Sequence, residues 1–167
     1  GRSADYVLTG LFSQLALQEA LSVGPVRVAG SSAASGFCRI PSAQELRLDP
    51  DAAYVHITEN NTAEGTEYAA PPDVGAVPLV ADLSSTIFSR RIDVSRYGLI
   101  YAGAQKNLGP SGVTVVIVRD DLLSRRGPAL PTIFRYGTHA AHDSTYNTPP
   151  TFAIYLLRNF LAWAKAV

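Results

Sequence analysis

Unbroken apolar runs, separated by polar and turn-rich segments, dominate the middle of the chain. Val77 to Asp82 is one such run, Gly98 to Gly103 is a second, and Val113 to Val118 is a third. Apolar runs of this length, bounded by turn residues, are typical of strands buried on both faces of a parallel sheet. The pattern therefore predicts an α/β fold with a mostly parallel central sheet and flanking helices.

Apolar residues recur at helical spacing near both ends of the chain. Ala4 to Val23 predicts an N-terminal turn that leads into a helix, which ends before Gly24 and Pro25. A second helix is expected from Thr151 to Lys165. We expect its apolar stripe to pack against the rest of the protein, and the stripe consists of Phe152, Tyr155, Leu156, Phe160 and Trp163.

Shorter elements are expected between these segments. Val26 to Ala29 and Tyr54 to Ile57 have the apolar character of short strands, and Pro41 to Leu46 predicts a single helical turn. Thr58 to Gly65 is polar and predicts a loop. Ser124 to Thr145 is rich in Arg, Gly, Pro and His, so an irregular segment is expected there.

The three histidines and Ser111 are candidate site residues. His56 lies inside a predicted strand, so a structural role is expected for it. His139 and His142, with Asp143, have a spacing that one helical face would allow for metal ligands, but no helical pattern surrounds them. We therefore expect no metal site. Ser111 lacks the G-x-S-x-G context of a hydrolase nucleophile.

Composition narrows the class of protein. The 167 residues are 47% hydrophobic, which is enough for the core of one domain. The 14 basic and 14 acidic side chains balance, so nothing favours nucleic acid or a membrane surface as a partner. No apolar run reaches membrane-spanning length and no signal-peptide pattern is present, which predicts a soluble, cytoplasmic protein.

Two single-residue observations add to this. Cys38 is the one cysteine, so no internal disulfide can form, and a packed or loop thiol in a reducing compartment is expected. The chain contains no methionine, including at position 1. We therefore expect that it begins inside a longer protein.

A carboxylate and a lysine follow two of the predicted strands. Asp82 ends one apolar run, and Lys106 lies just past the end of the next. If these strands are neighbours in a parallel sheet, both side chains reach the carboxyl edge, where open α/β sheets bind ligands. An amine and a carboxylate are what pyridoxal phosphate chemistry requires. A solvated rim lysine, or an ion pair across a strand end, explains the same residues, so these alternatives stay open.

One long segment has the motif of a known family. VADLSSTIFSRRIDVSRYGLIYAGAQKNLGPSGVTVVIVRDDLL, Val80 to Leu123, closely resembles the cofactor-lysine region of the phosphoserine aminotransferase family. STYNTPPTF, Ser144 to Phe152, is similar to another motif of that family. The resemblance is most specific from Ala81 to Pro150 and extends more weakly back to Ala4.

The resemblance implies a fold and a domain organisation. The fold would be the large, pyridoxal-phosphate-binding domain of a fold-type I aminotransferase, incomplete at both ends. Residues 1–167 would form part of that domain, and an N-terminal segment and a C-terminal small domain of the family are expected to be absent.

The resemblance also assigns roles at the cofactor. Lys106 would form the Schiff base with pyridoxal phosphate and then move protons, and Asp82 would keep the pyridine nitrogen protonated. Phe12 would stack on the ring, where the family usually has tryptophan. Thr62 would form a hydrogen bond on the 3-hydroxyl side of the cofactor, and Gln105 would contact its phosphate.

The resemblance also implies a homodimer, and the chain departs from the family pattern at one position. Asn147 and Thr148 would reach across a homodimer to the phosphate of the neighbour's cofactor, which implies that the folded site requires two subunits. The family usually has Asn-Glu-Thr where this chain has Asn60, Asn61 and Thr62. The threonine is retained while the acidic residue is lost.

The implied activity is amino transfer between glutamate or 2-oxoglutarate and 3-phosphohydroxypyruvate or O-phosphoserine, in serine biosynthesis. The family's substrate-binding basic residues lie largely outside this chain, so the chain alone is expected to be inactive. Two alternatives stay open. One is another fold-type I enzyme, such as a different aminotransferase or a cysteine desulfurase, and the other is a noncatalytic module that retains the fold.

Overall fold

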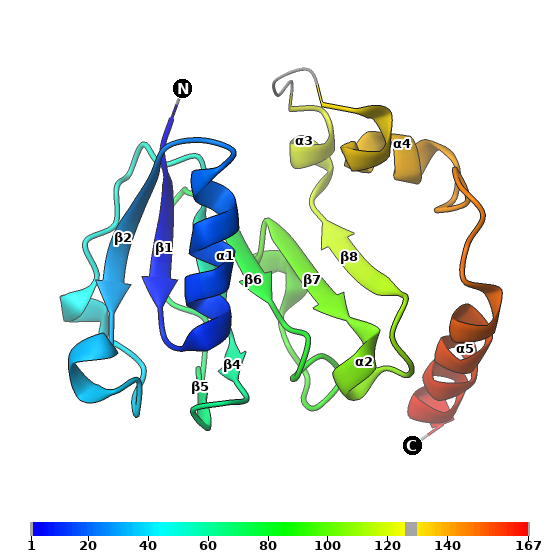
Figure 1. Cartoon of the computed structure of the whole chain (residues 1–167), viewed down its shortest axis with the longest axis horizontal. Coiled ribbons are helices and arrows are strands. Elements are labelled where there is room, and N and C mark those ends of the chain that lie inside the picture. The colour runs from blue at the N-terminus through cyan, green and yellow to red at the C-terminus, as the bar shows by residue number, and fades with distance from the viewer. Residues whose placement is uncertain (1, 126–129, 167) are drawn as a thin grey trace.

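A six-stranded sheet with the order β2-β1-β3-β6-β7-β8 runs through the molecule (Figure 1). The computed structural model describes residues 2–125 and 130–166. Neighbouring strands are parallel except for β7 and β8, which are antiparallel. The prediction of a mostly parallel α/β sheet is therefore confirmed. The strands are β1 Ala4–Leu8, β2 Val26–Ser31, β3 Val55–Thr58, β6 Leu79–Asp82, β7 Leu99–Gly103 and β8 Thr114–Val118.

The connections carry helices and one small hairpin. Asn60–Asn61 (β4) and Thr66–Glu67 (β5) form a two-stranded antiparallel hairpin after β3. The described helices are α1 Leu11–Leu21, α2 Ala104–Asn107, α3 Asp120–Leu123, α4 Tyr136–Ala141 and α5 Thr151–Ala166, and the short 3-10 turns are Ala33–Ser35, Ala43–Glu45, Val94–Arg96 and Thr132–Phe134. None of these helices is long and apolar enough to cross a membrane.

Three sequence-based expectations were wrong. Residues 4–8 form a central strand rather than a turn, and the apolar pattern of that strand is broken by Asp5, which is fully buried. Its carboxylate accepts hydrogen bonds from Arg27 Nε at 2.9 Å and Nη2 at 3.0 Å. The polar segment after β3 contains a hairpin, and the segment expected to be irregular contains α4, which includes His139.

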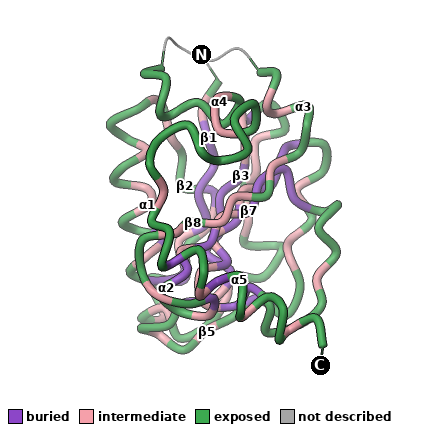
Figure 2. The backbone as a smooth tube through the Cα atoms, turned by 90° about the vertical axis from the view of Figure 1, so that its right-hand side faces the viewer, coloured by how far each residue is buried: buried purple, intermediate pink, exposed green. Residues whose placement is uncertain are grey.

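The two faces of the sheet are covered differently, because successive side chains of a strand point to opposite faces. One face carries the core, whose buried members include Val55, Ile57, Ala81 and Ile100. Figure 2 shows the buried backbone concentrated along the central strands, with exposed segments outside them. Burial on this face stabilises the fold by roughly 1.5–3 kcal/mol for each large side chain.

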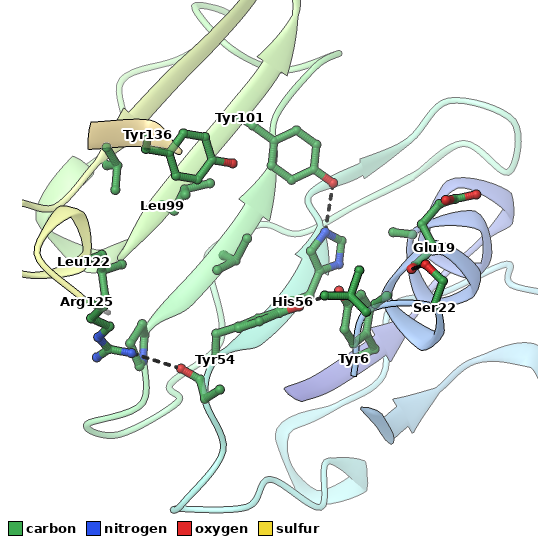
Figure 3. A pocket seen from close by; sticks show the side chains of 17 residues that line it. Tyr6, Glu19, Ser22, Tyr54, His56, Leu99, Tyr101, Leu122, Arg125 and Tyr136 are labelled. Carbon is green, nitrogen blue, oxygen red and sulfur yellow. Dashed lines mark hydrogen bonds between the residues drawn. The ribbon is translucent and has the colours of Figure 1, made fainter. Parts of the chain in front are cut away.

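The other face is only partly covered, by α1. It borders an open cavity of about 690 Å³ that lies between α1 and the α3–α4 region. Figure 3 shows aromatic side chains projecting into this space from the strands and from α4. Those labelled there are Tyr6, Tyr54, His56, Tyr101 and Tyr136.

The apolar stripe of α5 does not pack as expected. Phe152 is 72% exposed and Trp163 is 61% exposed, whereas the buried residues of this helix are Ala153 and Leu157. The prediction that the aromatic side chains pack against the rest of the chain is therefore wrong for Phe152, Tyr155 and Trp163, whereas Phe160 packs against the core and against Phe88 at a centroid distance of 6.1 Å. No second layer of the described chain covers that side of the helix.

His56 joins the polar network on the partly covered face. Its ring stacks on Tyr6 at a centroid distance of 4.7 Å, and its Nε2 forms a hydrogen bond with the Tyr101 hydroxyl at 2.9 Å. Burial lowers the pKa of His56 from 6.5 to about 4, and its Nδ1 has no hydrogen-bond partner in the described chain. The structural role is supported, although only one ring nitrogen is satisfied.

The buried histidine predicts acid lability with a defined pH window. The unfolded chain binds a proton on this ring near pH 6.5, while the folded chain binds it only near pH 4. Stability should therefore be fully present above about pH 6.5 and fall as the pH is lowered towards 4, by at most roughly 3 kcal/mol. Urea unfolding at several pH values measures this slope. His56→Phe should flatten it and His142→Phe, at an exposed position, should not. Equal slopes in parent and His56→Phe would contradict the assignment.

Candidate active site

The carboxyl ends of β3, β6 and β7 meet at one edge of the sheet, together with the start of α1 and the short helix α2 (Figure 1). β6 and β7 pair in parallel, with Asp82 opposite Tyr101. Asp82 therefore ends its strand at the edge from which α2 carries Lys106. The expected adjacency of the two strands is confirmed.

Lys106 is held between two residues that lie far from it in sequence. Its Nζ donates a hydrogen bond to the Thr62 hydroxyl at 3.2 Å, and the same nitrogen lies 4.2 Å from the centroid of the Phe12 ring. A cation over an aromatic face at this distance is attracted by the ring. The lysine, the threonine and the phenylalanine predicted for one site are thus in contact.

Asp82 is half-buried and its orientation is fixed. Its Oδ1 accepts a hydrogen bond from the backbone N–H of Ser84 at 2.8 Å. Thr58 and Tyr101 lie opposite it on the neighbouring strands. Burial, and next the negative charge of Asp82, raise the pKa of Tyr101. The Thr58 hydroxyl is buried and has no hydrogen-bond partner among the described residues. A hydroxyl that can still form hydrogen bonds therefore lies next to the Asp82 carboxylate.

The start of α1, which carries Phe12, is tied to the loop that carries Thr62. Leu11 donates its backbone N–H to Glu64 Oε1 at 2.8 Å, and the Thr9 hydroxyl donates to Asn61 Oδ1 at 3.0 Å. A carboxylate at a helix N-terminus is stabilised by the helix dipole. Because Glu64 already occupies this N-terminus, a phosphate group would have to bind elsewhere along the edge.

A buried carboxylate, Glu59, anchors the loop that carries Thr62, and the sequence did not predict this contact. Glu59 is fully buried and accepts hydrogen bonds from Arg90 Nη2 at 2.7 Å and from the Tyr97 hydroxyl at 3.0 Å. A second carboxylate, Glu67, lies 3.3 Å from Arg90 Nη1. A glutamate after a strand and an arginine in a distant turn carry no signal that they pair, so only the fold could reveal this contact.

The side chains of the other predicted site residues, Gln105, Asn147 and Thr148, form no hydrogen bond with Lys106 in the described chain. Gln105 is exposed, and its amide lies against Gly103, where it leaves no room for a side chain. Asn147 and Thr148 are exposed in the segment between α4 and α5, and Asn147 lines a hollow together with Gly112, Val113 and Thr114. Within the described chain, Asn147 donates to the Thr148 carbonyl at 3.4 Å.

The histidines make backbone contacts rather than a cluster. His139 Nε2 donates to the Ile133 carbonyl, and His142 Nδ1 donates to the Thr138 carbonyl, both at 2.8 Å. In the described ranges, no group of three or more His, Cys, Asp or Glu side chains is arranged to hold a metal ion.

Comparison with known proteins shows the class to which this arrangement belongs. The family model "Aminotransferase class-V" matches residues 4–167. The chain belongs to the class-V aminotransferase family.

Several curated relatives at about half identity are phosphoserine aminotransferases. The phosphoserine aminotransferases of Desulfatibacillum aliphaticivorans and Niallia circulans are 56% and 52% identical to this chain, each over 99% of it. The chain covers 45% and 46% of them, so it spans about half the length of the curated relatives it matches.

Solved structures agree with these relatives. A phosphoserine aminotransferase from Bacillus circulans subsp. alkalophilus superposes with a TM-score of 0.95 at 51% identity, over 99% of this chain and 46% of that one. A PLP-bound phosphoserine aminotransferase from Trichomonas vaginalis superposes with a TM-score of 0.91 at 37% identity, over 99% of this chain and 50% of that one.

Removing the cation beside Glu59 should destabilise the fold. Arg90→Ala leaves a buried carboxylate with the Tyr97 hydroxyl and no ion pair, and Arg90 itself is 34% exposed. We expect a loss of about 2–3 kcal/mol, which is less than for a fully buried pair because water partly screens the charge. Urea unfolding measures it. Arg119→Ala, which breaks an exposed pair with Asp121, is the matched control and should cost less than about 1 kcal/mol. Equal effects of the two substitutions would contradict a buried ion pair.

Proposed function

We propose that this chain is the cofactor-binding part of a phosphoserine aminotransferase, with Lys106 as the residue that binds pyridoxal phosphate covalently. The observation that carries the proposal is the position of the lysine amine against the Phe12 ring and the Thr62 hydroxyl, at the edge where Asp82 ends β6. The names of the relatives at about half identity support the same conclusion.

The residues present fit the cofactor. Pyridoxal phosphate, when bound, supplies an aldehyde that links to amines and a pyridinium ring that accepts electrons released at the substrate's α-carbon. Phe12 offers a flat apolar face for a ring. The half-buried Asp82 offers a fixed carboxylate, and the buried Thr58 hydroxyl opposite it on β3 has no hydrogen-bond partner in the described chain, so it is available to a polar group. The domain assignment follows: residues 1–167 are part of the large, cofactor-binding domain.

Each residue then has a defined role. Asp82 would accept a hydrogen bond from the ring nitrogen and keep it protonated, because a carboxylate favours the charged partner. Thr62 would donate to or accept from the 3-hydroxyl side. Gln105 would contact the phosphate, which cannot bind at the N-terminus of α1 because Glu64 occupies it. Phe12 would hold the ring by stacking with less overlap than the tryptophan usual in the family.

Lys106 would have two tasks. Its Nζ would be the nucleophile that holds the cofactor. Lys106 is exposed, so the amine is accessible, and its Nζ lies 4.2 Å from the centroid of the Phe12 ring. When it is not bound to the cofactor, the same amine would serve as the general base and acid that moves the proton at the substrate's α-carbon. The hydrogen bond to Thr62 fixes the direction of approach.

The proposal extends to partners that the single chain does not contain. Glutamate, 2-oxoglutarate, O-phosphoserine and 3-phosphohydroxypyruvate would be the small-molecule substrates, within serine biosynthesis in the cytoplasm. Asn147 and Thr148 would contribute to the neighbouring site of a homodimer, which accounts for exposed polar side chains that contact neither Lys106 nor Thr62 in the described chain. A different class-V enzyme, such as a cysteine desulfurase, would share Lys106 and Asp82 but differ in its substrate residues.

The first test is covalent labelling. The chain has two lysines, Lys106 and Lys165, so peptide mapping after incubation with pyridoxal phosphate and borohydride reduction distinguishes them clearly. We expect the label on Lys106, at least about tenfold above Lys165, because only Lys106 lies in the site. Lys106→Arg should abolish the specific label and Lys165→Arg should leave it. Asp82→Ala should retain it, because the carboxylate acts on the ring nitrogen and not on the amine.

Equal labelling of both lysines would show an ordinary surface reaction and would support the noncatalytic alternative. Label on Lys106 without any phosphoserine turnover in a longer polypeptide that contains this chain would instead favour another class-V activity.

A second test concerns activity of the chain by itself. The purified 167 residues should not transfer the amino group of glutamate to 3-phosphohydroxypyruvate, because one face of the sheet is open and further substrate residues of the family are expected to lie outside the chain. A coupled assay for 2-oxoglutarate formation measures this. Turnover above the rate of free pyridoxal phosphate would contradict the expectation.

A further inference from the structure

Ser84 makes two hydrogen bonds that link the two ends of the candidate site. Its backbone N–H donates to Asp82 Oδ1 at 2.8 Å, and its hydroxyl oxygen accepts the backbone N–H of Gly103 at 3.0 Å. Gly103 is the residue from which α2, and with it Lys106, begins. One side chain and one amide of a single residue thus connect the carboxylate to the lysine-bearing helix.

The hydroxyl replaces a missing backbone acceptor. Leu83 donates its N–H to the Tyr101 carbonyl at 2.9 Å, which continues the β6–β7 ladder one step past Asp82. In a regular parallel ladder the next bond would run from the Gly103 N–H to the Leu83 carbonyl. That carbonyl instead accepts from Thr86 at 3.0 Å and from Ile87 at 2.9 Å, because the chain turns away there. The Ser84 hydroxyl therefore occupies the acceptor position that the turn has vacated.

We propose that Ser84 is a positioning residue that fixes the distance and orientation between Asp82 and Lys106. This inference rests on the proposed function, because it concerns the two groups that would bind opposite ends of one cofactor. Without the hydroxyl, the Gly103 N–H at the end of β7 would lack a partner in the described chain. The start of α2 would keep the bond from the Ala104 N–H to the Val113 carbonyl at 2.9 Å on the β8 side, but it would lose its link to the β6 side, which carries Asp82. The hydrogen bond between the Ser84 N–H and Asp82 would persist, so the carboxylate itself would stay in place.

Serine is suited to this position by size. Its oxygen is one bond from Cβ, and Ser84 is half-buried next to the strand ends. Threonine retains the hydroxyl at the same reach, whereas alanine removes it and leaves the backbone donor to Asp82 unchanged. Ser89 provides a matched control, because its hydroxyl donates to the Thr86 carbonyl at 2.7 Å in the same turn and contacts no candidate site residue in the described chain.

Amide hydrogen exchange tests the contact without any cofactor. In Ser84→Ala the Gly103 amide should exchange about tenfold faster than in the parent, which corresponds to the loss of one ordinary hydrogen bond. The Leu83 amide, bonded to the Tyr101 carbonyl, is the internal reference and should change less than twofold. Ser84→Thr should restore slow exchange at Gly103, and Ser89→Ala should not alter it. Unchanged exchange in Ser84→Ala overturns the proposal.

Labelling kinetics test the consequence for the site. With pyridoxal phosphate kept limiting, Ser84→Ala should label Lys106 about tenfold more slowly than the parent, and Ser84→Thr should recover most of the rate. A general loss of stability would lower the unfolding midpoint substantially, whereas the loss of this one hydrogen bond should shift it only slightly. Parental labelling in Ser84→Ala overturns the proposal. If the parent itself gains no label on Lys106, the proposed function fails, while the exchange experiment still decides whether Ser84 holds Gly103.

Discussion

The parallel pairing of β6 with β7 is the constraint on which the site depends. It brings the last residue of β6, Asp82, to the edge from which α2 carries Lys106, although a long turn separates the two in sequence. Parallel neighbours require such a connection, and their carboxyl ends meet at the same edge. The Ser84 hydroxyl extends this pairing past the last regular ladder bond. The geometry of two chemically different groups is therefore set largely by backbone hydrogen bonds.

Two carboxylates, Glu59 and Glu64, hold the loop that carries Thr62 on the other side of the site. The loop that carries Thr62 is anchored through Glu59 to Arg90 and tied through Glu64 to the start of α1. Neither carboxylate contacts the lysine in the described chain, yet together they determine where the Thr62 hydroxyl and the Phe12 ring lie. A buried carboxylate is unfavourable unless it is paired, so these contacts favour one loop conformation over others.

The exposed apolar surface is informative about the rest of the protein. Aromatic side chains of α5 are exposed, and one face of the sheet borders an open cavity beside α1. The chain spans about half the length of the relatives it matches. Both observations agree with the proposal that these residues are one part of a longer protein. This is also why the proposed activity is assigned to a longer assembly rather than to these residues alone.

The sequence by itself predicted the strand class, and its resemblance to a known family selected Thr62 and Phe12 as neighbours of Lys106, because unbroken apolar runs and a specific motif are local signals. The adjacency of β6 and β7 was a conditional inference that the tertiary structure confirmed. It missed β1, whose pattern is interrupted by the buried Asp5, and it missed α4, since Gly and His obscure helical spacing. Only the tertiary structure revealed the partners of Glu59, Glu64 and Ser84. Those contacts join segments distant along the chain, and a side chain's hydrogen-bonding partner is decided by where the backbone brings it, which composition and periodicity do not encode.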